Sequence, residues 1–183
     1  MNVADEPIIE VKGLVTQFGD QVVHDHLDFS VNRGEIMAIV GGSGAGKSVL
    51  MQTIIGLIRP KAGQIRVLGH DVSNLSDSEM IDLEKHWGVL FQDGALFSSL
   101  SVAQNIEVPM AEHVALPPGL RFELASLKIA MVGLTQDAAY KYPSELSGGM
   151  RKRAGLARAL ALDPEILFLD EPTAPVEARA PEL

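Results

Sequence analysis

The chain contains no cysteine, few aromatic residues and no long hydrophobic run. The absence of cysteine excludes a disulfide framework, a thiol nucleophile and a cysteine-ligated zinc site. The longest apolar runs, such as residues 36–40, are about five residues long, whereas a membrane-spanning helix needs about 20. The first seven residues are acidic and lack the basic start and apolar stretch of a signal peptide. We therefore expect a soluble, cytoplasmic protein.

Basic residues are also scarce, with 15 Lys and Arg against 24 Asp and Glu and a net charge of −9. Proteins that bind nucleic acid generally present a basic surface, so we expect no nucleic-acid partner. The remaining composition, 46% hydrophobic and 21% charged, is that of a globular protein and excludes global disorder. A length of 183 residues fits one large domain, or a domain with a subdomain.

The hydrophobic pattern alternates between strands and helices. Alternating apolar residues predict strands over residues 8–31, with a turn at Gly19-Asp20. Two continuous apolar segments, residues 36–40 and 166–169, predict strands buried on both faces. Short strands are also expected at 64–72 and 88–91, and helices at 49–57, 76–85, 148–162 and across 101–145, with a break at Pro117-Pro118-Gly119. This order indicates an α/β fold with an inserted helical region.

Three smaller patterns concern which side chains are buried. One helical stripe is expected to face the core and comprises Leu120, Leu124, Leu127, Met131 and Leu134. His24 and His26 are two residues apart on a predicted strand and should share one face. Since no third metal ligand has suitable spacing, we expect that face to be solvated. The basic residues 151–153 are likewise expected on an exposed helix face.

Residues 41–48 form a glycine-rich loop that fits the pattern G-x-x-x-x-G-K-[ST], between a predicted strand and a predicted helix. The glycines allow backbone N–H groups to wrap a polyphosphate, and the following helix N-terminus adds partial positive charge. Lys47 is expected to reach the β- and γ-phosphates, and the Ser48 hydroxyl to coordinate Mg²⁺. The nucleotide contacts expected from this segment are Gly41, Gly42, Ser43, Gly44, Ala45, Gly46, Lys47, Ser48 and Val49.

The apolar segment 166–169 ends in Asp170-Glu171. At the carboxyl end of a parallel strand, Asp170 is placed to hold Mg²⁺ or its water. Glu171 is then placed to polarise the water that attacks the γ-phosphate. A buried strand capped by solvated acids is the alternative for this pattern alone, and the phosphate loop upstream favours the catalytic interpretation.

The segment Pro143-Ser144-Glu145-Leu146-Ser147-Gly148-Gly149, followed by Arg-Ala-Leu-Ala and then Leu-Asp-Glu-Pro-Thr, resembles the nucleotide-binding subunit of ABC transporters. The resemblance extends nearly to Thr173, although Met150 stands where the family usually has glutamine. It implies a P-loop NTPase core with an antiparallel β subdomain over residues 1–92 and a helical subdomain over 93–145. Residues 146–183 would then carry the signature helix and the acidic strand back to the core.

The same resemblance implies an ATPase that uses ATP and Mg²⁺ and works as a head-to-tail homodimer. In such a dimer Ser147, Gly148 and Gly149 of one subunit face the phosphate loop of the other. Gln92 resembles the glutamine that senses Mg²⁺, so the implied catalytic residues are Glu171, Lys47 and Gln92, and the implied metal ligands are Ser48, Gln92 and Asp170. Phe18 resembles the aromatic residue that stacks on adenine, with packing in the β subdomain as its alternative.

A finer resemblance lies in residues 94–102 together with Asn105, Pro109 and Glu112-His113. These positions are similar to the ATPases of Mla-type lipid-trafficking systems. The resemblance implies a membrane permease that docks near Leu96 and Phe97, an MCE-domain lipid-binding protein in the same complex, and a peripheral position on the inner face of the cell membrane. For Leu96 and Phe97 the alternative is packing inside the helical subdomain.

After Thr173 the chain departs from the family pattern. The sequence Ala174-Pro175-Val176 stands where a Ser-Gly-Leu-Asp-Pro loop is expected, and no histidine follows Asp170. We therefore expect the C-terminal part of the fold to be missing and turnover to be far below that of a complete homologue. One alternative is a nucleotide-binding remnant with little or no turnover. An ABC-type ATPase of DNA repair is less favoured, since only 100 residues separate Lys47 from Ser147 and cannot hold a long coiled coil.

Overall fold

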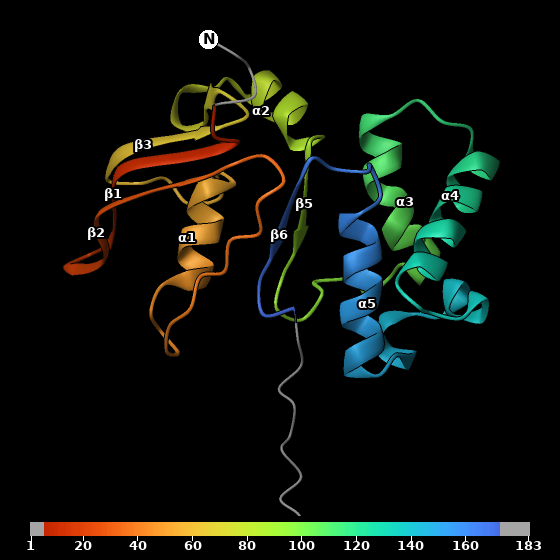
Figure 1. Cartoon of the computed structure of the whole chain (residues 1–183). Coiled ribbons are helices and arrows are strands. Elements are labelled where there is room, and N and C mark those ends of the chain that lie inside the picture. Colours follow the sequence, from red (N-terminus) through yellow and green to blue (C-terminus); the bar gives the residue numbers. More distant parts are fainter. Residues whose placement is uncertain (1–5, 173–183) are drawn as a thin grey trace, which may run out of the picture. The chain divides into compact units, whose positions relative to one another are not determined.

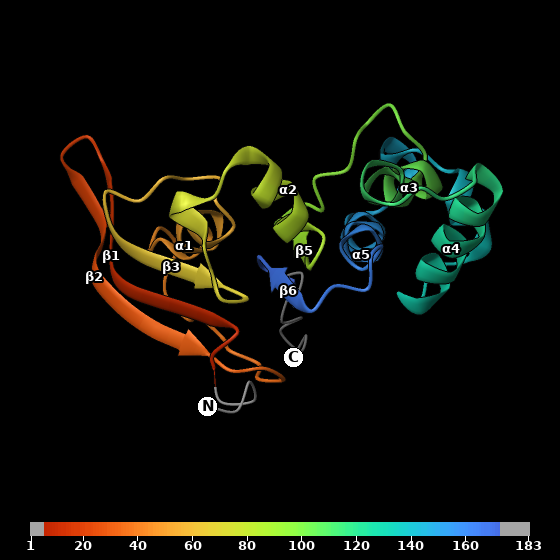
Figure 2. The ribbon, with the colours of Figure 1, turned by 90° about the horizontal axis from the view of Figure 1, so that it is seen from above.

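The computed structural model describes residues 6–172, which divide into two compact units between Ile81 and Asp82. Figure 1 labels the helices and strands of both units, and Figure 2 gives a second view of them. Among the described residues no helix is long and apolar enough to cross a bilayer. The departure from the family pattern after Thr173 lies outside the described residues.

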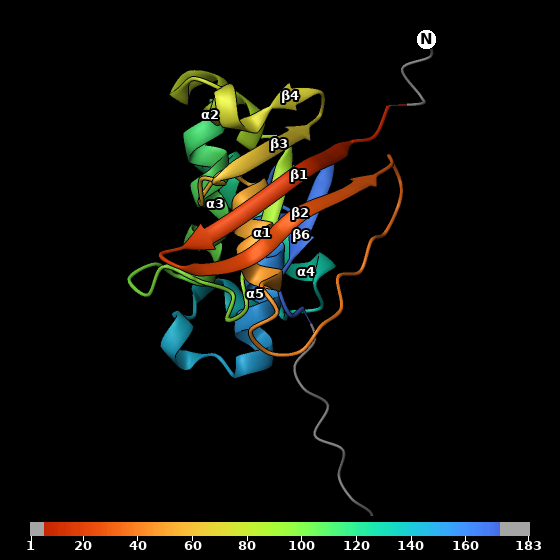
Figure 3. The same ribbon diagram turned by 90° about the vertical axis from the view of Figure 1, so that its left-hand side faces the viewer.

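The first unit is built on a four-stranded antiparallel sheet. Its strands, in sheet order, are β2 (Gln21–Val31), β1 (Ile9–Phe18), β3 (Ala62–Val67) and β4 (His70–Asp71). Figure 3 shows β1 lying between β2 and β3. The helices of this part of the chain are α1 (Lys47–Ile54), the short η2 (Val72–Asn74) and α2 (Asp77–Glu84). The strands predicted over residues 8–31 and 64–72, the turn at Gly19-Asp20 and the helix before residue 85 are confirmed.

The pairing of β1 with β2 contains several irregularities. Thr16 pairs with His24, but the next residue, Gln17, pairs with Val22. Val23 is therefore an extra residue in β2, which is the arrangement of a β-bulge. A second shift occurs between Leu14 and Thr16, where β2 contains His26 with a positive φ of 50°. These bulges break the period-two rule along β2.

The predicted buried strand at residues 36–40 is wrong. The segment has no strand structure, and Ile36 and Val40 are 96% and 91% exposed. Within the described part of the first unit no strand pairs with this segment. An apolar run becomes a buried strand only when neighbours satisfy its backbone and cover its side chains, and in this unit those neighbours are lacking.

The second unit combines a parallel strand pair with a helical cluster. Its elements are β5 (Trp87–Leu90), α3 (Val102–His113), α4 (Pro118–Met131), η3 (Gln136–Tyr140), η4 (Pro143–Glu145), α5 (Gly148–Ala159) and β6 (Ile166–Leu169). Strands β5 and β6 pair in parallel. Figure 2 shows α5 between this strand pair and helices α3 and α4. The predicted strands and helices of this unit are confirmed.

The core of the second unit lies among α3, α4 and α5, where Ile106, Ala125, Ile129 and Ala154 are fully buried. Each helix begins at a recognisable signal. At the start of α3, Ser101 accepts from the Gln104 amide while the Gln104 side chain accepts from the Ser101 amide, a complete capping box. The short loop before α4 ends at Pro118, where proline is well tolerated because the first helical N–H needs no partner.

Two burial predictions for this unit are wrong. Leu120, Leu127 and Met131 of the expected core stripe are 42%, 55% and 59% exposed. Helix α4 instead buries Ala125, Lys128 and Ile129, because its other face carries enough apolar surface to pack on α3. Strand β6 is also only partly covered, since it pairs on one side alone and alternates between buried and exposed residues.

Candidate functional site

The glycine-rich loop leads directly into helix α1. Gly44 and Gly46 have positive φ values of 79° and 85°, which glycine adopts without strain. Gly46 is the N-cap of α1, and no side chain caps the amides that follow it. The first amide used inside the helix is that of Leu50, which donates to the Gly46 carbonyl at 2.8 Å. The amides of residues 47–49 therefore form a helix N-terminus available to an anion.

Lys47 folds back over this loop. Its Nζ donates to the carbonyl oxygens of Gly41 and Gly42, both at 2.8 Å. These contacts hold a positive charge above the turn without pairing it with a carboxylate. A polyphosphate entering the loop would offer the same ammonium stronger, charged acceptors in place of two neutral carbonyls.

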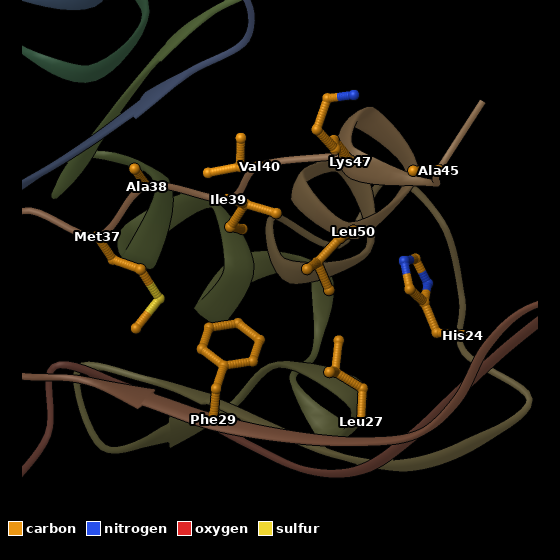
Figure 4. Close-up of a pocket in the computed structure, with 10 residues that line it drawn as sticks. All are labelled: His24, Leu27, Phe29, Met37, Ala38, Ile39, Val40, Ala45, Lys47 and Leu50. Carbon is orange, nitrogen blue, oxygen red and sulfur yellow. The ribbon is translucent and has the colours of Figure 1, made fainter. Parts of the chain in front are cut away.

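The space beside the loop is a hollow of about 310 Å³ within the first unit. Figure 4 shows that residues 37–40 and the start of α1 border it on one side, and that His24, Leu27 and Phe29 of β2 point into it from the other. The sequence interpretation of His24 as part of a solvated strand face is therefore wrong. His26 is exposed and contacts Asp25, and the bulges of β2 explain why the two histidines differ.

Phe18 ends strand β1 and is 49% exposed. Its backbone pairs with Gln21 across the turn. An aromatic ring at a strand end with half of its surface free is suited to stacking, so its predicted role at adenine stays a prediction.

The second unit brings Gln92 and Glu171 together. Strands β5 and β6 are parallel and aligned from Trp87–Ile166 to Leu90–Leu169, so their carboxyl ends meet at one edge. Gln92 and Glu171 each lie two residues beyond those ends. The Gln92 Nε2 donates to the Glu171 Oε2 at 3.0 Å. The structure thus brings together two of the residues that the resemblance implied to be catalytic.

The backbone of Glu171 is held in an unusual conformation. Its φ is 46°, in the left-handed region that non-glycine residues rarely adopt. The residue before it, Asp170, continues the strand by donating its amide to the Leu90 carbonyl at 2.8 Å. Lys152 of α5 donates from Nζ to the Glu171 carbonyl at 2.8 Å. Lys152 therefore fastens the turn that aims the Glu171 carboxylate.

The signature segment forms the start of helix α5. Ser147 is the N-cap, and its hydroxyl accepts from the Met150 amide at 3.3 Å. The Met150 side chain packs against the helical core, which is why an apolar residue fits where the family usually has glutamine. Gly148 and Gly149 occupy the first helical positions. The three residues thus present a capped helix N-terminus with little side-chain bulk.

The basic residues of α5 are not a simple solvated face. Arg151 donates to the Leu146 carbonyl at 2.9 Å, and Arg153 to the Gly133 carbonyl at 2.7 Å. Together with Lys152, all three cations of residues 151–153 bind backbone oxygens, so the predicted exposure is only part of their environment. No residue pattern indicates these pairings, because every residue has a backbone carbonyl that can accept a hydrogen bond.

Arg158 near the end of α5 holds the loop that follows Gln92. Its guanidinium donates to the carbonyls of Ala95 at 2.8 Å and Gly94 at 3.0 Å. It also lies 5.7 Å from the centre of the Phe97 ring. Burial lowers the pKa of Arg158 below its usual range, and these contacts offset the cost of that burial. Sequence reasoning missed this residue.

Asn105 fixes the next part of the same loop. It is fully buried, and its Oδ1 accepts from the Phe97 amide at 2.8 Å. Its Nδ2 donates to the carbonyls of Phe97, Leu100 and Ser101. Leu96 packs partly against the helical core, whereas Phe97 is 52% exposed. Of the two residues predicted to contact a permease, only Phe97 presents a largely free side chain.

The donor set for a Mg²⁺ ion consists of oxygen ligands. Among residues 6–172 no three His, Cys, Asp or Glu side chains converge as a metal site. Asp170 and Gln92 nevertheless follow neighbouring parallel strands, and Ser48 follows the lysine of the loop. Carboxylate, amide and hydroxyl oxygens suit a hard cation that also binds phosphate oxygens and water. Taken within its own unit, each of these residues therefore carries a side-chain oxygen of the kind that Mg²⁺ prefers.

A loop of this kind, an acidic strand end and a capped signature helix together define a nucleotide-binding cassette. The ABC transporter family matches residues 24–174 of the chain. The protein therefore belongs to the ABC transporter family, and the predicted resemblance is confirmed.

Individual members of the family indicate which ABC transporter ATPases this chain is similar to. The intermembrane phospholipid transport system ATP-binding protein MlaF of Haemophilus influenzae is 45% identical over 92% of this chain and 63% of MlaF. The "Probable ribonucleotide transport ATP-binding protein mkl" of Mycobacterium leprae is 44% identical over 90% of this chain and 47% of mkl. The chain thus spans less than two thirds of the length of either relative.

Among solved structures, a dimeric ATP-binding cassette bound to ADP and Pi in a post-hydrolysis state has a TM-score of 0.86 and 27% identity. The match covers 93% of this chain and 76% of the solved one. This likeness confirms the predicted nucleotide-binding α/β fold with its antiparallel sheet and its helical region.

Proposed function

We propose that the protein is the ATP-binding subunit of an ABC transporter and hydrolyses ATP to drive a membrane permease. The observation that carries this proposal is the contact between Gln92 and Glu171 at the end of the parallel strands. It holds the Glu171 carboxylate at a strand edge, where a general base is needed beside the γ-phosphate. When Mg²⁺ is bound, it supplies charge neutralisation of the phosphate oxygens.

Each named residue has a separate task in this proposal. The loop residues Gly41 to Val49 bind the phosphates through their amides, and Lys47 leaves its two carbonyls for the β- and γ-phosphates. Ser48, Gln92 and Asp170 offer oxygen ligands to Mg²⁺, and Phe18 stacks on adenine. Glu171 accepts the proton of the attacking water.

The proposed working form is a head-to-tail homodimer. Gly148 and Gly149 place little bulk at the start of α5, so a phosphate of the nucleotide bound to a second copy can approach that helix N-terminus. The solved cassette of similar fold is dimeric, which supports this assembly. As a working division of the chain, we propose a core over 1–92, a helical subdomain over 93–145, and a return to the core over 146–183.

The test compares the purified chain with Lys47→Ala and Glu171→Gln. We expect Mg²⁺-dependent ATP hydrolysis, loss of ATP binding in Lys47→Ala, and a loss of turnover of about 10²-fold or more in Glu171→Gln with binding retained. Glu171→Gln should also elute as a dimer in size-exclusion chromatography when ATP and Mg²⁺ are present. Binding of ATP with neither turnover nor dimerisation would support a nucleotide-binding remnant instead.

We further propose that the permease partner moves phospholipid and carries an MCE-domain lipid-binding protein in the same complex at the inner face of the membrane. MlaF is described as part of a phospholipid transport system, and its similarity to this chain supports phospholipid as the substrate class. The relative mkl is instead described as a probable ribonucleotide transport protein. The exposed ring of Phe97, fixed by Arg158 and Asn105, is the proposed docking point for the permease together with Leu96. An apolar side chain on a rigid loop is suited to such a contact.

Docking is tested by co-expression and co-purification with the membrane permease proposed as the partner. Phe97→Glu should abolish co-purification, because a carboxylate cannot be buried in an apolar contact without cost. Leu127→Glu is the matched control, since Leu127 is similarly exposed at 55% but lies on α4. Equal retention of the permease by both variants would contradict the proposed docking point. Transfer of labelled phospholipid or labelled ribonucleotide by the reconstituted complex distinguishes the two substrates.

A further inference from the structure

Strand β2 contacts the phosphate loop from outside the loop's own sequence. A Cβ atom placed on Gly46 would lie 2.6 Å from the Cγ1 of Val23 and 2.9 Å from the Nε2 of His24. Val23 and His24 are adjacent residues, which in a regular strand would point to opposite faces. The bulge at Val23, where β2 has an extra residue opposite Thr16 and Gln17, lets both of them face the loop.

The His24 ring is in an environment that defines its hydrogen bond. Figure 4 shows the ring extending from β2 toward the start of α1. The Nδ1 atom of this ring is buried and has no hydrogen-bond partner. Of the two ring nitrogens, Nε2 is therefore the one placed to form a hydrogen bond. Apolar groups including Leu27, Phe29 and Leu50 line the same hollow. Burial lowers the pKa of His24, and a hydrogen bond with the backbone of Gly46 raises it by less. We therefore expect a neutral ring with its proton on Nε2.

We propose that His24 is a positioning residue for the phosphate loop: its Nε2–H holds the Gly46 carbonyl and thereby keeps the loop in the form that accepts a polyphosphate. The inference rests on the proposed binding of ATP at residues 41–49. It adds a residue of the antiparallel sheet to a site otherwise built from the loop and its helix.

The Gly46 carbonyl is the atom at which this support acts. It already accepts the Leu50 amide, the first hydrogen bond of α1, and a carbonyl oxygen can accept a second donor. Gly46 is in the left-handed conformation, with a φ of 85°. A second hydrogen bond to its carbonyl favours that conformation over the others open to glycine. The amides of residues 47–49, which depend on the orientation of Gly46, then remain turned toward the phosphates.

Two substitutions separate this hydrogen bond from packing. In His24→Phe a ring still fills the apolar hollow but the donor is lost, whereas in His24→Gln the amide Nε2 replaces the donor and the ring is lost. We expect His24→Phe to weaken binding of a fluorescent ATP analogue by about three- to tenfold, the usual effect of one lost hydrogen bond. His24→Gln should remain within about twofold of the unmodified chain. His26→Phe and His26→Gln are the matched controls on the same strand, and they should leave binding unchanged because His26 is exposed.

Competition with tripolyphosphate shows whether the loss of binding in His24→Phe arises at the phosphate loop. Because His24 acts on the phosphate loop, His24→Phe should weaken tripolyphosphate and the ATP analogue by the same factor. Unchanged binding in His24→Phe, or an equal loss in His24→Gln, would overturn the proposal and leave His24 a packing residue. If His24→Phe lowers the unfolding temperature and binding is not measurable, His24→Leu replaces it.

Nitrogen NMR of the unmodified chain is an independent test. The expected state of His24 is the neutral ring with hydrogen on Nε2, and a proton on Nδ1 would overturn the proposal. The measurement needs no nucleotide, so it still tests His24 if the chain fails to bind ATP. Failure of the unmodified chain to bind ATP, with the tautomer as expected, would overturn the proposed function instead.

Discussion

Residues 36–40 in the first unit and β6 in the second unit are both short, continuous apolar segments, and both lie next to a functional motif. Strand β6 pairs with β5 and leads into Asp170 and Glu171 with a continued hydrogen bond from Asp170 to Leu90. Residues 36–40 lead into the phosphate loop without any strand pairing in their unit, and their ends are almost fully exposed. The acidic residues of the second unit thus follow a paired backbone, whereas the phosphate loop of the first unit is supported by α1, by Lys47 and by contacts from β2.

The comparison shows what a buried-strand pattern depends on. An apolar segment can be buried at little cost for its side chains. To form a strand, however, its backbone must also pair with a neighbouring strand whose hydrogen-bonding groups are free. In the second unit β5 provides that neighbour and α5 covers one face of it, with Gly88 of β5 packed directly on α5. In the first unit the sheet consists of β1 to β4 in antiparallel order, and residues 36–40 pair with none of these strands.

The largest predicted effect is a difference in stability between two Ile→Ala variants, one in the helical core of the second unit and one in residues 36–40 of the first unit. Ile129→Ala removes a fully buried side chain from the helical core and should lower the free energy of unfolding by about 2–5 kcal/mol. The same change at Ile36, which is 96% exposed, should cost less than about 0.5 kcal/mol. Urea unfolding followed by circular dichroism measures both. A loss at Ile36 as large as that at Ile129 would show that residues 36–40 are buried in solution.

Adding one methyl group at two glycines probes the same difference. A Cβ on Gly88 would lie 2.0 Å from the Ala159 carbonyl oxygen, whereas a Cβ on Gly42 would meet nothing within 4 Å. Gly88→Ala should therefore destabilise the second unit by about 1–3 kcal/mol through overpacking. The fluorescence of Trp87, the only tryptophan of the chain, reports this directly because it adjoins Gly88. Gly42→Ala should leave the urea midpoint unchanged, and an unaltered Gly88→Ala would refute the close packing of β5 on α5.

The smallest predicted effect is an opposite pH dependence in the two units. The hydrogen bond from Gln64 lowers the pKa of Asp71 in the first unit. Asp71 therefore stabilises the fold above its unfolded pKa of about 3.8, and this is lost as the pH falls through its lower folded value. Burial raises the pKa of Glu107 in the second unit. Its charged form costs stability at neutral pH, and the fold regains it as the pH falls through the raised value.

Each contribution should be a few tenths of a kcal/mol, because Asp71 is accessible to solvent and Glu107 faces Arg121. Urea midpoints between pH 3 and 7 for Asp71→Asn and Glu107→Gln measure them against the unmodified chain. Asp71→Asn should flatten the acid side of the profile, and Glu107→Gln should raise stability near neutral pH. The same sign in both variants would contradict the assignments.

Much of this architecture could be predicted from local patterns. The phosphate loop, the break at Pro117-Pro118-Gly119 and the helix that begins after Ser147 all depend on residues close in the sequence. What could not be predicted depends on pairing at a distance. Lys152 and Arg158 bind carbonyl oxygens far along the chain, and any residue supplies a carbonyl. A pattern of side chains therefore contains no trace of these contacts.

The misplaced faces have a related cause. His24 and His26 were expected on one face, but the bulges of β2 shift the alternation between them, and bulges leave no reliable signal in a single sequence. Of the expected stripe, Leu120, Leu127 and Met131 are exposed, whereas Leu124 and Leu134 contact the core. The remaining core-facing positions of α4 are Ala125, Lys128 and Ile129. When a helix has two apolar faces, tertiary packing decides which of them is buried.

The contact of Arg158 with the carbonyls of Gly94 and Ala95 has a consequence for how this protein can change over generations. Since a carbonyl oxygen is the same in every residue, Arg158 holds the course of the loop whatever side chains the loop carries. Substitutions at Leu96 and Phe97 can therefore alter the outer surface of the loop while its backbone path is kept. The outer surface of this loop can thus diverge in sequence while the rest of the unit is inherited unaltered.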